Sequence, residues 1–346
     1  MKCLPTILDA IGNTPLVHLK RLSEELGIHI CAKIEGLNPG GSAKDRIAKY
    51  IVETAEAEGI ITSDTTIVEA TSGNTGFSLA MVAAVKGYRC ICTTTDKSSE
   101  EKISQLRILG AEVEVCPASV SSDDPRSYYS RAQAIADSIP GGIYINQYFN
   151  LSNQLAHYHT TGPELWKQTG GDLTHFIAPA STGGTISGTA RYLKEQNKDI
   201  KIIAVDAYGS VLKKYFETGE IDPNEAYSYR IEGLGKKLIP GNLDFDLIDE
   251  FVKATDEDAA FKARELARKE GIFAGYTSGA TISALYKIAA KLPKNARVVV
   301  ILSDHGSKYL SKIYSDQWMT DQGFLPNQKH DQLNGKHKHS KSPQNA

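Results

Sequence analysis

The sequence predicts an α/β protein of about two domains, in which helices cover open parallel sheets. Three observations carry this prediction. The chain has 346 residues, 41% hydrophobic and 23% charged, a balance typical of a globular protein with a sizeable core. Short apolar runs alternate with amphipathic segments along the chain, as in repeated βαβ units. The run at 296–302 is almost continuously apolar, which indicates a strand buried on both faces of a parallel sheet.

The first half of the chain shows this alternation clearly. Apolar and β-branched runs predict strands at 29–35, 65–70, 89–94 and 111–116. Helices are predicted at 45–58, 77–86 and 100–109. Ile47, Ile51 and Ala55 lie four residues apart and give the first of these helices an apolar face. Gly59 ends that helix.

The second half repeats the pattern. Strands are predicted at 142–147, 174–179, 200–206 and 296–302, and a helix at 186–196. Thr255 and Asp258 have the spacing of a capping box that opens a further helix, which Gly271 closes. Residues 327–346 are almost wholly polar and are interpreted as a disordered, solvated tail. Weak metal binding is an alternative for its three histidines, His330, His337 and His339.

Composition excludes several classes of function. The formal net charge is −2, and no Lys/Arg run is interleaved with aromatic residues, so we expect no nucleic-acid partner. No stretch approaches the roughly 20 apolar residues of a membrane span, and the N-terminus lacks the apolar segment of a signal peptide. The sequence therefore predicts a cytoplasmic protein without a membrane partner.

The five cysteines are interpreted as free thiols, mostly buried. Four of them lie in or beside apolar runs, namely Cys31, Cys90, Cys92 and Cys116. Cys90 and Cys92 share one face of a strand, which is conceivable for a metal pair. No nearby Cys or His pair completes a tetrahedral set, so we expect no metal site.

A glycine-rich segment places a lysine at the start of a helix. Gly40 and Gly41 give a tight loop, and Ser42 with Asp45 has the spacing of a capping box. Lys44 then falls in the first helical turn, where unpaired NH groups disfavour a cation by about 0.3–1 kcal/mol and lower the pKa of an amine. Lys44 is therefore a candidate nucleophile, and the alternative is a solvated surface lysine.

Two loops of small and hydroxyl residues follow predicted strands, each ahead of a helix. The loop at 181–185 (STGGT) suits a phosphate, because paired glycines let backbone NH groups approach an anion. The loop at 71–75 (TSGNT) suits a carboxylate equally well. The first loop is not a Walker loop, and no Gly-x-Gly-x-x-Gly fingerprint is found, so a nucleotide-binding oxidoreductase is the weaker reading. A lysine, a phosphate site and a carboxylate site are what a pyridoxal phosphate enzyme acting on an amino acid requires.

Several segments in register resemble the fold type II pyridoxal phosphate enzymes of the cysteine synthase and cystathionine β-synthase family. They are IGNTPL (11–16), NPGGSAKDR (38–46), TSGNTG (71–76), TTGPE (160–164), TGGT (182–185), EGLG (232–235) and SGA (278–280). The resemblance covers about 7–325 and implies two open parallel-sheet α/β domains of the tryptophan synthase β-like type, with the cofactor between them. It implies a larger phosphate-binding domain of 1–40 plus 146–325, and a smaller mobile domain of 41–145.

The resemblance also implies how residues hold the cofactor. Lys44 is similar to the lysine that forms the Schiff base with pyridoxal 5'-phosphate, and Asn74 to the residue that bonds the ring oxygen. Thr277 takes the place of a serine facing the pyridine nitrogen, and a neutral hydroxyl there favours β-elimination. The phosphate cup corresponds to Ser181, Thr182, Gly183, Gly184 and Thr185.

The substrate site follows from the same resemblance. The carboxylate site corresponds to Thr71, Ser72, Asn74, Thr75 and Gln147, and Gly233 lies in the segment at its mouth. Serine or an O-activated serine displaces Lys44, and the freed amine then removes the Cα proton. The β-substituent leaves, a thiol adds to the β-carbon, and the smaller domain closes over the substrate.

The sequence does not determine which serine derivative is the donor or which thiol is the acceptor. Cystathionine β-synthase activity, from serine and homocysteine, and cysteine synthase activity are the principal expectations. O-Acetylserine sulfhydrylase activity with sulfide, lanthionine formation, serine dehydration and a non-catalytic amino-acid-binding protein are alternatives. Lys236 stands where cystathionine β-synthases often have tyrosine. The segment 315–319 is closer to cystathionine β-synthase, and 160–166 is closer to cysteine synthase.

Two further positions depart from the family pattern. Ser181 replaces a glycine, which would narrow the phosphate cup if that position needs a positive φ. Ala70 stands where proline is common. The span of the resemblance leads us to expect a catalytic core without a haem-binding region or regulatory modules. By analogy with the family we expect a homodimer with small-molecule amino-acid and thiol substrates.

Overall fold

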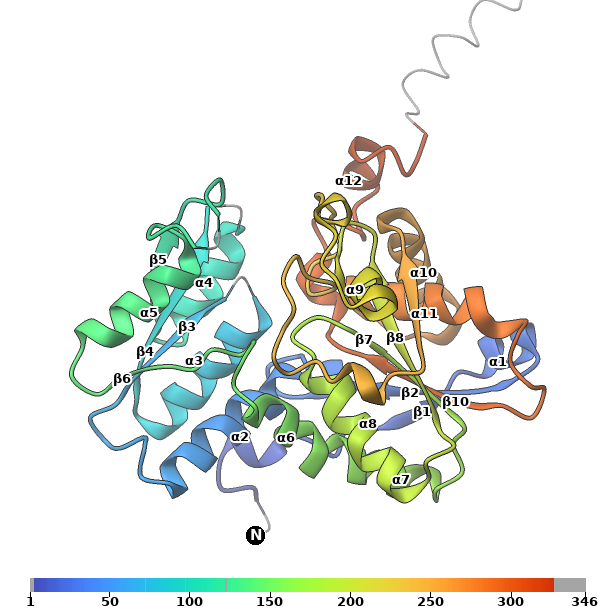
Figure 1. Cartoon of the computed structure of the whole chain (residues 1–346), viewed down its shortest axis with the longest axis horizontal. Coiled ribbons are helices and arrows are strands. Elements are labelled where there is room, and N and C mark those ends of the chain that lie inside the picture. The colour runs from blue at the N-terminus through green and yellow to red at the C-terminus, as the bar shows by residue number, and fades with distance from the viewer. Residues whose placement is uncertain (1–2, 72, 97, 122, 327–346) are drawn as a thin grey trace, which may run out of the picture.

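The structure is a computed structural model that describes residues 3–71, 73–96, 98–121 and 123–326. Figure 1 shows two lobes, each built around its own sheet, with α2 and α6 passing below the gap between them. This is the α/β architecture that the sequence predicts. The predicted tail at 327–346, with its three histidines, lies outside the described residues, as does Ser72.

The larger sheet has six strands in the order β1-β2-β10-β7-β8-β9. They are β1 (Leu16–His18), β2 (His29–Ile34), β7 (His175–Pro179), β8 (Lys201–Ala207), β9 (Glu250–Ala254) and β10 (Arg297–Leu302). Neighbouring strands are parallel except at the edge, where β1 runs antiparallel to β2. The sequence did not predict β1, because three residues carry too little periodicity to be recognised.

Helices cover both faces of the larger sheet. They are α1 (Lys20–Leu26), α6 (Ser152–His159), α7 (Thr161–Thr169), α8 (Gly184–Gln196), α9 (Leu212–Thr218), α10 (Asp256–Glu270), α11 (Tyr276–Ala289) and α12 (Asp316–Asp321). Along β10, Val298 and Val300 enter a core shared with α10 and α11. Val299 and Ile301 enter a second core, shared with α7 and α8. Burial on both faces explains why this strand is apolar from Val298 to Leu302, after the exposed Arg297 at its start.

The smaller sheet has four parallel strands in the order β5-β4-β3-β6. They are β3 (Thr66–Ala70), β4 (Arg89–Thr95), β5 (Glu112–Cys116) and β6 (Gly142–Tyr144). The covering helices are α2 (Lys44–Ala57), α3 (Asn74–Lys86), α4 (Glu100–Ile108) and α5 (Tyr128–Ser138). The first three pack on one face and α5 on the other. Short 3₁₀ turns are η1 (Ile7–Ala10), η2 (Glu35–Leu37), η3 (Pro223–Glu225), η4 (Phe245–Leu247) and η5 (Gly306–Tyr309).

The start of α2 differs from the prediction in one respect. The N-cap residue is Ala43, so the predicted capping box between Ser42 and Asp45 is wrong. The Asp45 carboxylate is buried and accepts the backbone NH of Gly40 at 2.5 Å, turning beneath the glycine loop instead of back to Ser42. Lys44 is nevertheless the first residue of the helix, as predicted.

The strand predicted at 142–147 ends at Tyr144. Asn146 has a φ of +54°, a left-handed conformation that a continuing strand does not allow. The chain therefore turns, and Gln147 and Tyr148 reach the cleft between the two sheets. Half of the capping box predicted before α10 is present, since Thr255 Oγ1 accepts the backbone NH of Asp258 at 3.0 Å.

All five cysteines are free. Cys90, Cys92 and Cys116 are buried, as predicted, whereas Cys31 is only partly buried and Cys3 is exposed.

Within the described ranges, no helix is both long and apolar enough to cross a membrane. In the same ranges, no three side chains among His, Cys, Asp and Glu are grouped so that they could hold a metal ion.

Candidate active site

A cleft between the two sheets is lined by residues that follow the carboxyl ends of strands in both. Its empty space, including the opening to solvent, is about 990 Å³. Ligands of parallel α/β sheets bind at this edge. The cleft collects most of the residues predicted from the sequence, namely Lys44, Thr71, Asn74, Thr75, Gln147, Ser181, Thr182, Gly183, Thr185, Gly233 and Thr277.

Lys44 opens α2 and faces this cleft. Burial lowers the pKa of its amine to about 8, and the nearby Asp304 carboxylate partly offsets that effect. The sequence predicts a lowered pKa from the helix terminus, whereas the structure assigns the larger part to desolvation. With this pKa, about a tenth of the amine is neutral at pH 7 and able to act as a nucleophile.

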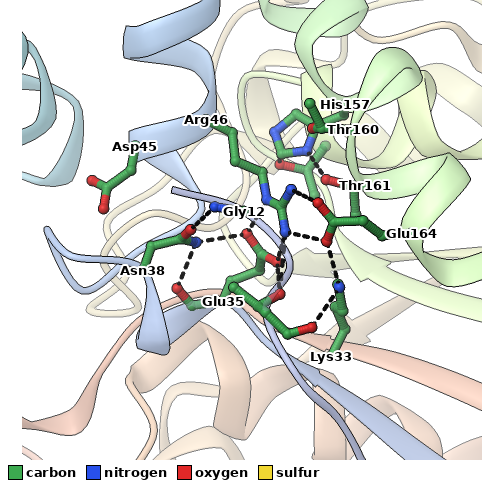
Figure 2. A network of polar contacts seen from close by, with 12 residues as sticks. Gly12, Lys33, Glu35, Asn38, Asp45, Arg46, His157, Thr160, Thr161 and Glu164 are labelled. Atoms are coloured by element: carbon green, nitrogen blue, oxygen red, sulfur yellow. Dashed lines mark hydrogen bonds and ion pairs between the residues drawn. The ribbon is translucent and has the colours of Figure 1, made fainter. Parts of the chain in front are cut away.

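Arg46, two residues after Lys44 in the same helix, anchors the start of α2 to the larger sheet. Its Nε and Nη2 donate to the two Glu35 oxygens at 2.7 and 2.8 Å. Its Nη1 and Nη2 donate to the two Glu164 oxygens, also at 2.7 and 2.8 Å (Figure 2). Lys33 Nζ donates to Glu164 Oε2 at 2.6 Å. Two cations and two carboxylates thus balance one another in a nearly dry site.

This network joins three structural elements, one of which is distant from the other two in sequence. Glu35 lies in η2 directly after β2, Glu164 in α7, and Arg46 in α2. Asn38 extends the network, because its Nδ2 donates to Glu35 Oε2 at 3.0 Å and its Oδ1 accepts the Gly12 NH at 2.9 Å (Figure 2). The helix that carries the reactive lysine is therefore held from several sides.

The predicted phosphate loop precedes α8, which begins at Gly184. A Cβ on Gly184 would lie 1.9 Å from Asn153 Oδ1, and a Cβ on Gly183 would lie 2.4 Å from the Leu243 backbone nitrogen. Gly183 also has a φ of +93°, so both glycines are needed. Ser181 does not have a positive φ, and serine fits there without backbone strain.

His157 orients a hydroxyl group of this loop. Its Nε2 lies 3.1 Å from Thr185 Oγ1, and its Nδ1 lies 2.8 Å from Thr161 Oγ1. Burial, aided by the charge of Arg46, lowers the pKa of His157 to about 3, so the ring is neutral. With the proton on Nε2, the ring donates to Thr185 and accepts from Thr161, which leaves the Thr185 hydroxyl proton free for an anion.

The loop after β3 is tied together by its own hydroxyl groups. Thr71 Oγ1 accepts the backbone NH of Gly76 at 3.0 Å. Thr75 Oγ1 donates to Gln147 Oε1 at 2.6 Å and so joins this loop to the segment after β6. The residues predicted to bind the substrate carboxylate therefore lie together, apart from Ser72, which is not among the described residues.

The Asn74 side-chain amide lies between a carboxylate and a lysine amine. Its Nδ2 donates to Asp304 Oδ2 at 2.9 Å, and its Oδ1 accepts from Lys308 Nζ at 2.6 Å. Asp304 Oδ2 also accepts from Tyr309 OH at 2.8 Å, while its Oδ1 is buried without a hydrogen-bond partner. Burial raises the pKa of Asp304, and the charge of Lys308 partly offsets this rise.

Thr277 and Gly233 form another wall of the cleft. Thr277 is buried in the first turn of α11, and a Cβ on Gly233 would lie 3.5 Å from its Cγ2. At the mouth, Glu232 forms ion pairs with Lys102 of α4 and with Lys312. One lysine of this mouth therefore comes from the smaller-sheet side and the other from the larger.

Sequence reasoning missed several cleft residues, among them Asp304, Lys308, Lys102 and Tyr148. A signal existed for Asp304, which stands two positions beyond β10, at the end of the chain's most continuous apolar strand. A polar side chain at the carboxyl end of a buried parallel strand is a candidate ligand-binding residue. The lysines lie in exposed-looking polar segments and gave no such signal.

The cleft fits a cofactor that carries both an aldehyde and a phosphate. Lys44 offers an amine of lowered pKa, the close-packed Gly183-Gly184 turn offers a helix N-terminus without Cβ atoms, and Asp304 offers an unpartnered oxygen. This combination, set between two parallel sheets, defines the class of pyridoxal phosphate enzymes.

Comparison with known proteins agrees with that class. Residues 7–304 match the family described as "Pyridoxal-phosphate dependent enzyme". The chain belongs to this family, and its cofactor is pyridoxal 5'-phosphate.

The relatives narrow the comparison further. The chain is 46% identical to cystathionine beta-synthase of Apis mellifera over 326 residues, which cover 94% of this chain and 64% of that protein. It is 40% identical to cysteine synthase 1 of Neurospora crassa over 322 residues, 92% of this chain and 85% of that protein. The chain thus spans less than two thirds of the Apis mellifera relative.

A solved structure matches along its whole length. It is the O-acetylserine dependent cystathionine beta-synthase from Helicobacter pylori, with a TM-score of 0.81 and 39% sequence identity. The match covers 91% of this chain and 100% of that one.

Proposed function

We propose that this chain catalyses β-replacement on L-serine or an O-activated serine, with a thiol as the incoming group. Bound pyridoxal phosphate supplies the electron sink that allows the Cα–H bond of an amino acid to break. The main supporting observation is that Lys44, Gly183, Thr71 and Thr75 line one cleft. Cystathionine β-synthase and cysteine synthase activities are the two forms of this reaction that the relatives support.

The proposed roles follow from position. Lys44 Nζ would hold the cofactor through its aldehyde carbon at rest, and the Lys44 amine, once freed by the substrate amine, would accept and later return the Cα proton. The 181–185 loop, with its Thr185 hydroxyl oriented by His157, binds the phosphate. Asn74 reaches the cofactor ring between Asp304 and Lys308. Thr277, which lines the same cleft, would offer the cofactor's ring nitrogen a neutral hydroxyl group, which would leave that nitrogen unprotonated.

The substrate carboxylate is assigned to the loop after β3 with Gln147. Thr71, Asn74 and Thr75 lie at the N-terminus of α3, where backbone NH groups favour an anion, and Ser72 is included by resemblance to the family. The predicted domain 41–145, which contains all four strands of the smaller sheet, closes over the bound substrate. Loss of water from the closed cleft strengthens each of these polar contacts.

The charges at the mouth favour a thiol that is itself an amino acid. Glu232 stands between Lys102 and Lys312, an alternation that matches the ammonium and carboxylate groups of homocysteine or cysteine. Sulfide offers neither group. We therefore infer thioether formation as the main reaction, with sulfide as a poorer acceptor.

The test uses the purified protein with pyridoxal phosphate. We expect a visible cofactor band that is absent in Lys44→Ala, and a thioether product, identified by mass spectrometry, from serine or an activated serine with homocysteine or cysteine. Glu232→Gln should raise KM for the amino-acid thiol and leave KM for sulfide unchanged. A protein that binds the cofactor but turns over no donor with any thiol would instead be a non-catalytic amino-acid-binding protein.

We further propose a homodimer in the cytoplasm. Five free thiols suit a reducing compartment, and exposed apolar side chains such as Leu37 and Leu151 suit a subunit contact. Sedimentation velocity at micromolar concentration should give twice the 37.6 kDa chain mass. A single species at the chain mass would contradict the dimer.

A further inference from the structure

Lys236 is a cation in the cleft without an anionic partner. Its Nζ donates to Tyr148 OH at 2.9 Å, and both side chains line the same cavity as Lys44. Among the described residues, no carboxylate lies within ion-pairing distance of Lys236. Lys102 and Lys312 at the mouth, by contrast, each form an ion pair with Glu232. Lys236 is partly buried, and a charge that is shielded from solvent without a counter-ion is costly. Such groups concentrate at functional sites.

The surroundings of Lys236 make it a reversible proton carrier. Burial, reinforced by the positive charge of Lys44, lowers its pKa to about 8. Burial also raises the pKa of Tyr148 well above its ordinary value, so the tyrosine stays neutral and lets Lys236 keep its hydrogen bond in either protonation state. The other ionisable side chains that line the cleft are Lys44, Lys102, Glu232, Asp304, Lys308 and Tyr309. Both the ammonium and the amine form of Lys236 are accessible near neutral pH.

We propose that Lys236 is a second proton-transfer residue of the site, dedicated to the β-substituent while Lys44 serves the α-carbon. This inference rests on the proposed β-replacement. When serine is the donor, the Cβ–O bond breaks with its electron pair on oxygen, and the Lys236 ammonium gives that oxygen a proton, so water leaves. The incoming thiol then forms the Cβ–S bond and gives its proton to the neutral Lys236 amine. Each turnover returns both lysines to their starting states, and no redox partner is needed.

The division of labour has a chemical reason. Hydroxide is a poor leaving group and needs a proton, whereas an activated substituent departs without one. Lys44 carries the Cα proton during this interval and returns it only after the thiol has added. A separate acid lets the oxygen leave while Lys44 is occupied. Lys236 therefore specifies unactivated serine as a competent donor for this chain.

The experiment measures the first half of the reaction in the holoenzyme, before any thiol is added. Stopped-flow absorbance of the bound cofactor gives the rate of β-substituent loss from L-serine and from β-chloro-L-alanine, whose chloride leaves without a proton. Lys236→Met should lower the serine rate at least 100-fold and the chloroalanine rate less than threefold. Lys236→Arg keeps a charge but does not release a proton, and should be as slow with serine as Lys236→Met. Lys237→Met alters the exposed neighbour and should match the wild type.

A second measurement does not depend on turnover. Competitive acetylation of the holoenzyme, read by mass spectrometry, should give Lys236 a reactivity midpoint near pH 8. The serine rate of the wild type should fall above the same pH, because the ammonium form is lost, whereas the chloroalanine rate should not.

Each other outcome overturns the proposal. Equal losses with both donors would make Lys236 a shape-determining residue only, and no loss with either would leave the proton to Lys44. A wild type that uses chloroalanine but not serine would sink the Lys236 role and leave β-replacement standing. A wild type that uses neither donor would overturn the proposed function and this inference with it.

Discussion

Removing Arg46 should destabilise the protein by about 3 kcal/mol at pH 7, because it leaves Glu35 buried without its main counter-ion. In Arg46→Met, Glu35 keeps bonds from Thr14 Oγ1 at 2.7 Å and Asn38 Nδ2 at 3.0 Å but loses both guanidinium contacts. Glu164 is less affected, since Lys33 still pairs with it at 2.6 Å. The deficit is therefore concentrated on one carboxylate that solvent does not reach.

The magnitude follows from the Glu35 pKa. Burial alone would raise this pKa, but the Arg46 guanidinium outweighs it, and the pKa falls from 4.5 to about 2. That difference corresponds to about 3 kcal/mol at neutral pH, at the lower end of the range for breaking a buried ion pair. A lowered carboxyl pKa stabilises the folded wild type above pH 4.5, and this contribution is lost as the pH falls through 2. In the variant, burial raises the Glu35 pKa instead, so the gap between the two proteins should shrink on acidification.

The assay is urea unfolding of both proteins without cofactor, because bound ligand adds its own stabilisation. Fluorescence of the two tryptophans, Trp166 in α7 and Trp318 in α12, and far-ultraviolet circular dichroism report the transition. The double variant Glu35→Gln/Arg46→Met should recover much of the loss, since no buried charge remains unpaired. Arg89→Met, which breaks an exposed pair with Glu112, should leave the midpoint unchanged. An Arg46→Met midpoint equal to the wild type at pH 7 would refute the reasoning.

Three shorter predictions concern the cofactor. Gly184→Ala should weaken pyridoxal phosphate binding at least tenfold in a fluorescence titration. The reason is that the added Cβ would lie 1.9 Å from Asn153 Oδ1, and overpacking costs about 1–3 kcal/mol. Unchanged affinity would show that the loop relaxes freely. His157→Ala should weaken binding about fivefold, the worth of one hydrogen bond of about 1 kcal/mol, without shifting the pH profile of binding, because His157 has a pKa of about 3 and is already neutral. The rate of cofactor uptake by the cofactor-free protein should rise with pH and level off above about 8, as the Lys44 amine becomes neutral; a flat profile would contradict the lowered pKa.

The sequence predicts those parts of this molecule that have a local cause. The strands β3, β4, β7 and β10 were visible as apolar runs, and the helix-start position of Lys44 followed from the two glycines before it. The 181–185 loop could be recognised because its glycine and hydroxyl residues come directly after a predicted strand and before a helix, where backbone NH groups bind anions. Each of these features depends on residues within about ten positions of one another. Over that range, secondary-structure propensity and residue spacing are enough to predict the local structure.

The features that the sequence did not predict depend on contacts between distant segments. Arg46 and Glu164 are 118 positions apart, and Asn74 and Asp304 are 230 apart, yet each pair is in hydrogen-bond contact. No spacing rule connects such residues, because the fold alone brings α2 to α7 and the start of α3 to the segment after β10. The predicted capping box at Ser42 failed for the same reason, since Asp45 found a distant partner in Ser78 Oγ, at 2.5 Å.

The net charge of the chain does not predict the charge of its cleft. The whole chain carries a formal charge of −2. The cleft, however, is lined by four lysines, Lys44, Lys102, Lys236 and Lys308, against two carboxylates, Glu232 and Asp304. An acidic chain thus encloses a basic cavity with low-dielectric walls, which focuses the field and attracts anions such as a phosphate or an amino-acid carboxylate. Burial lowers the pKa of Lys44 and of Lys236 to about 8, and for Lys236 repulsion by the positive charge of Lys44 adds to this effect. A bound phosphate and carboxylate would relieve that repulsion, so ligand binding and the protonation of these lysines must be coupled.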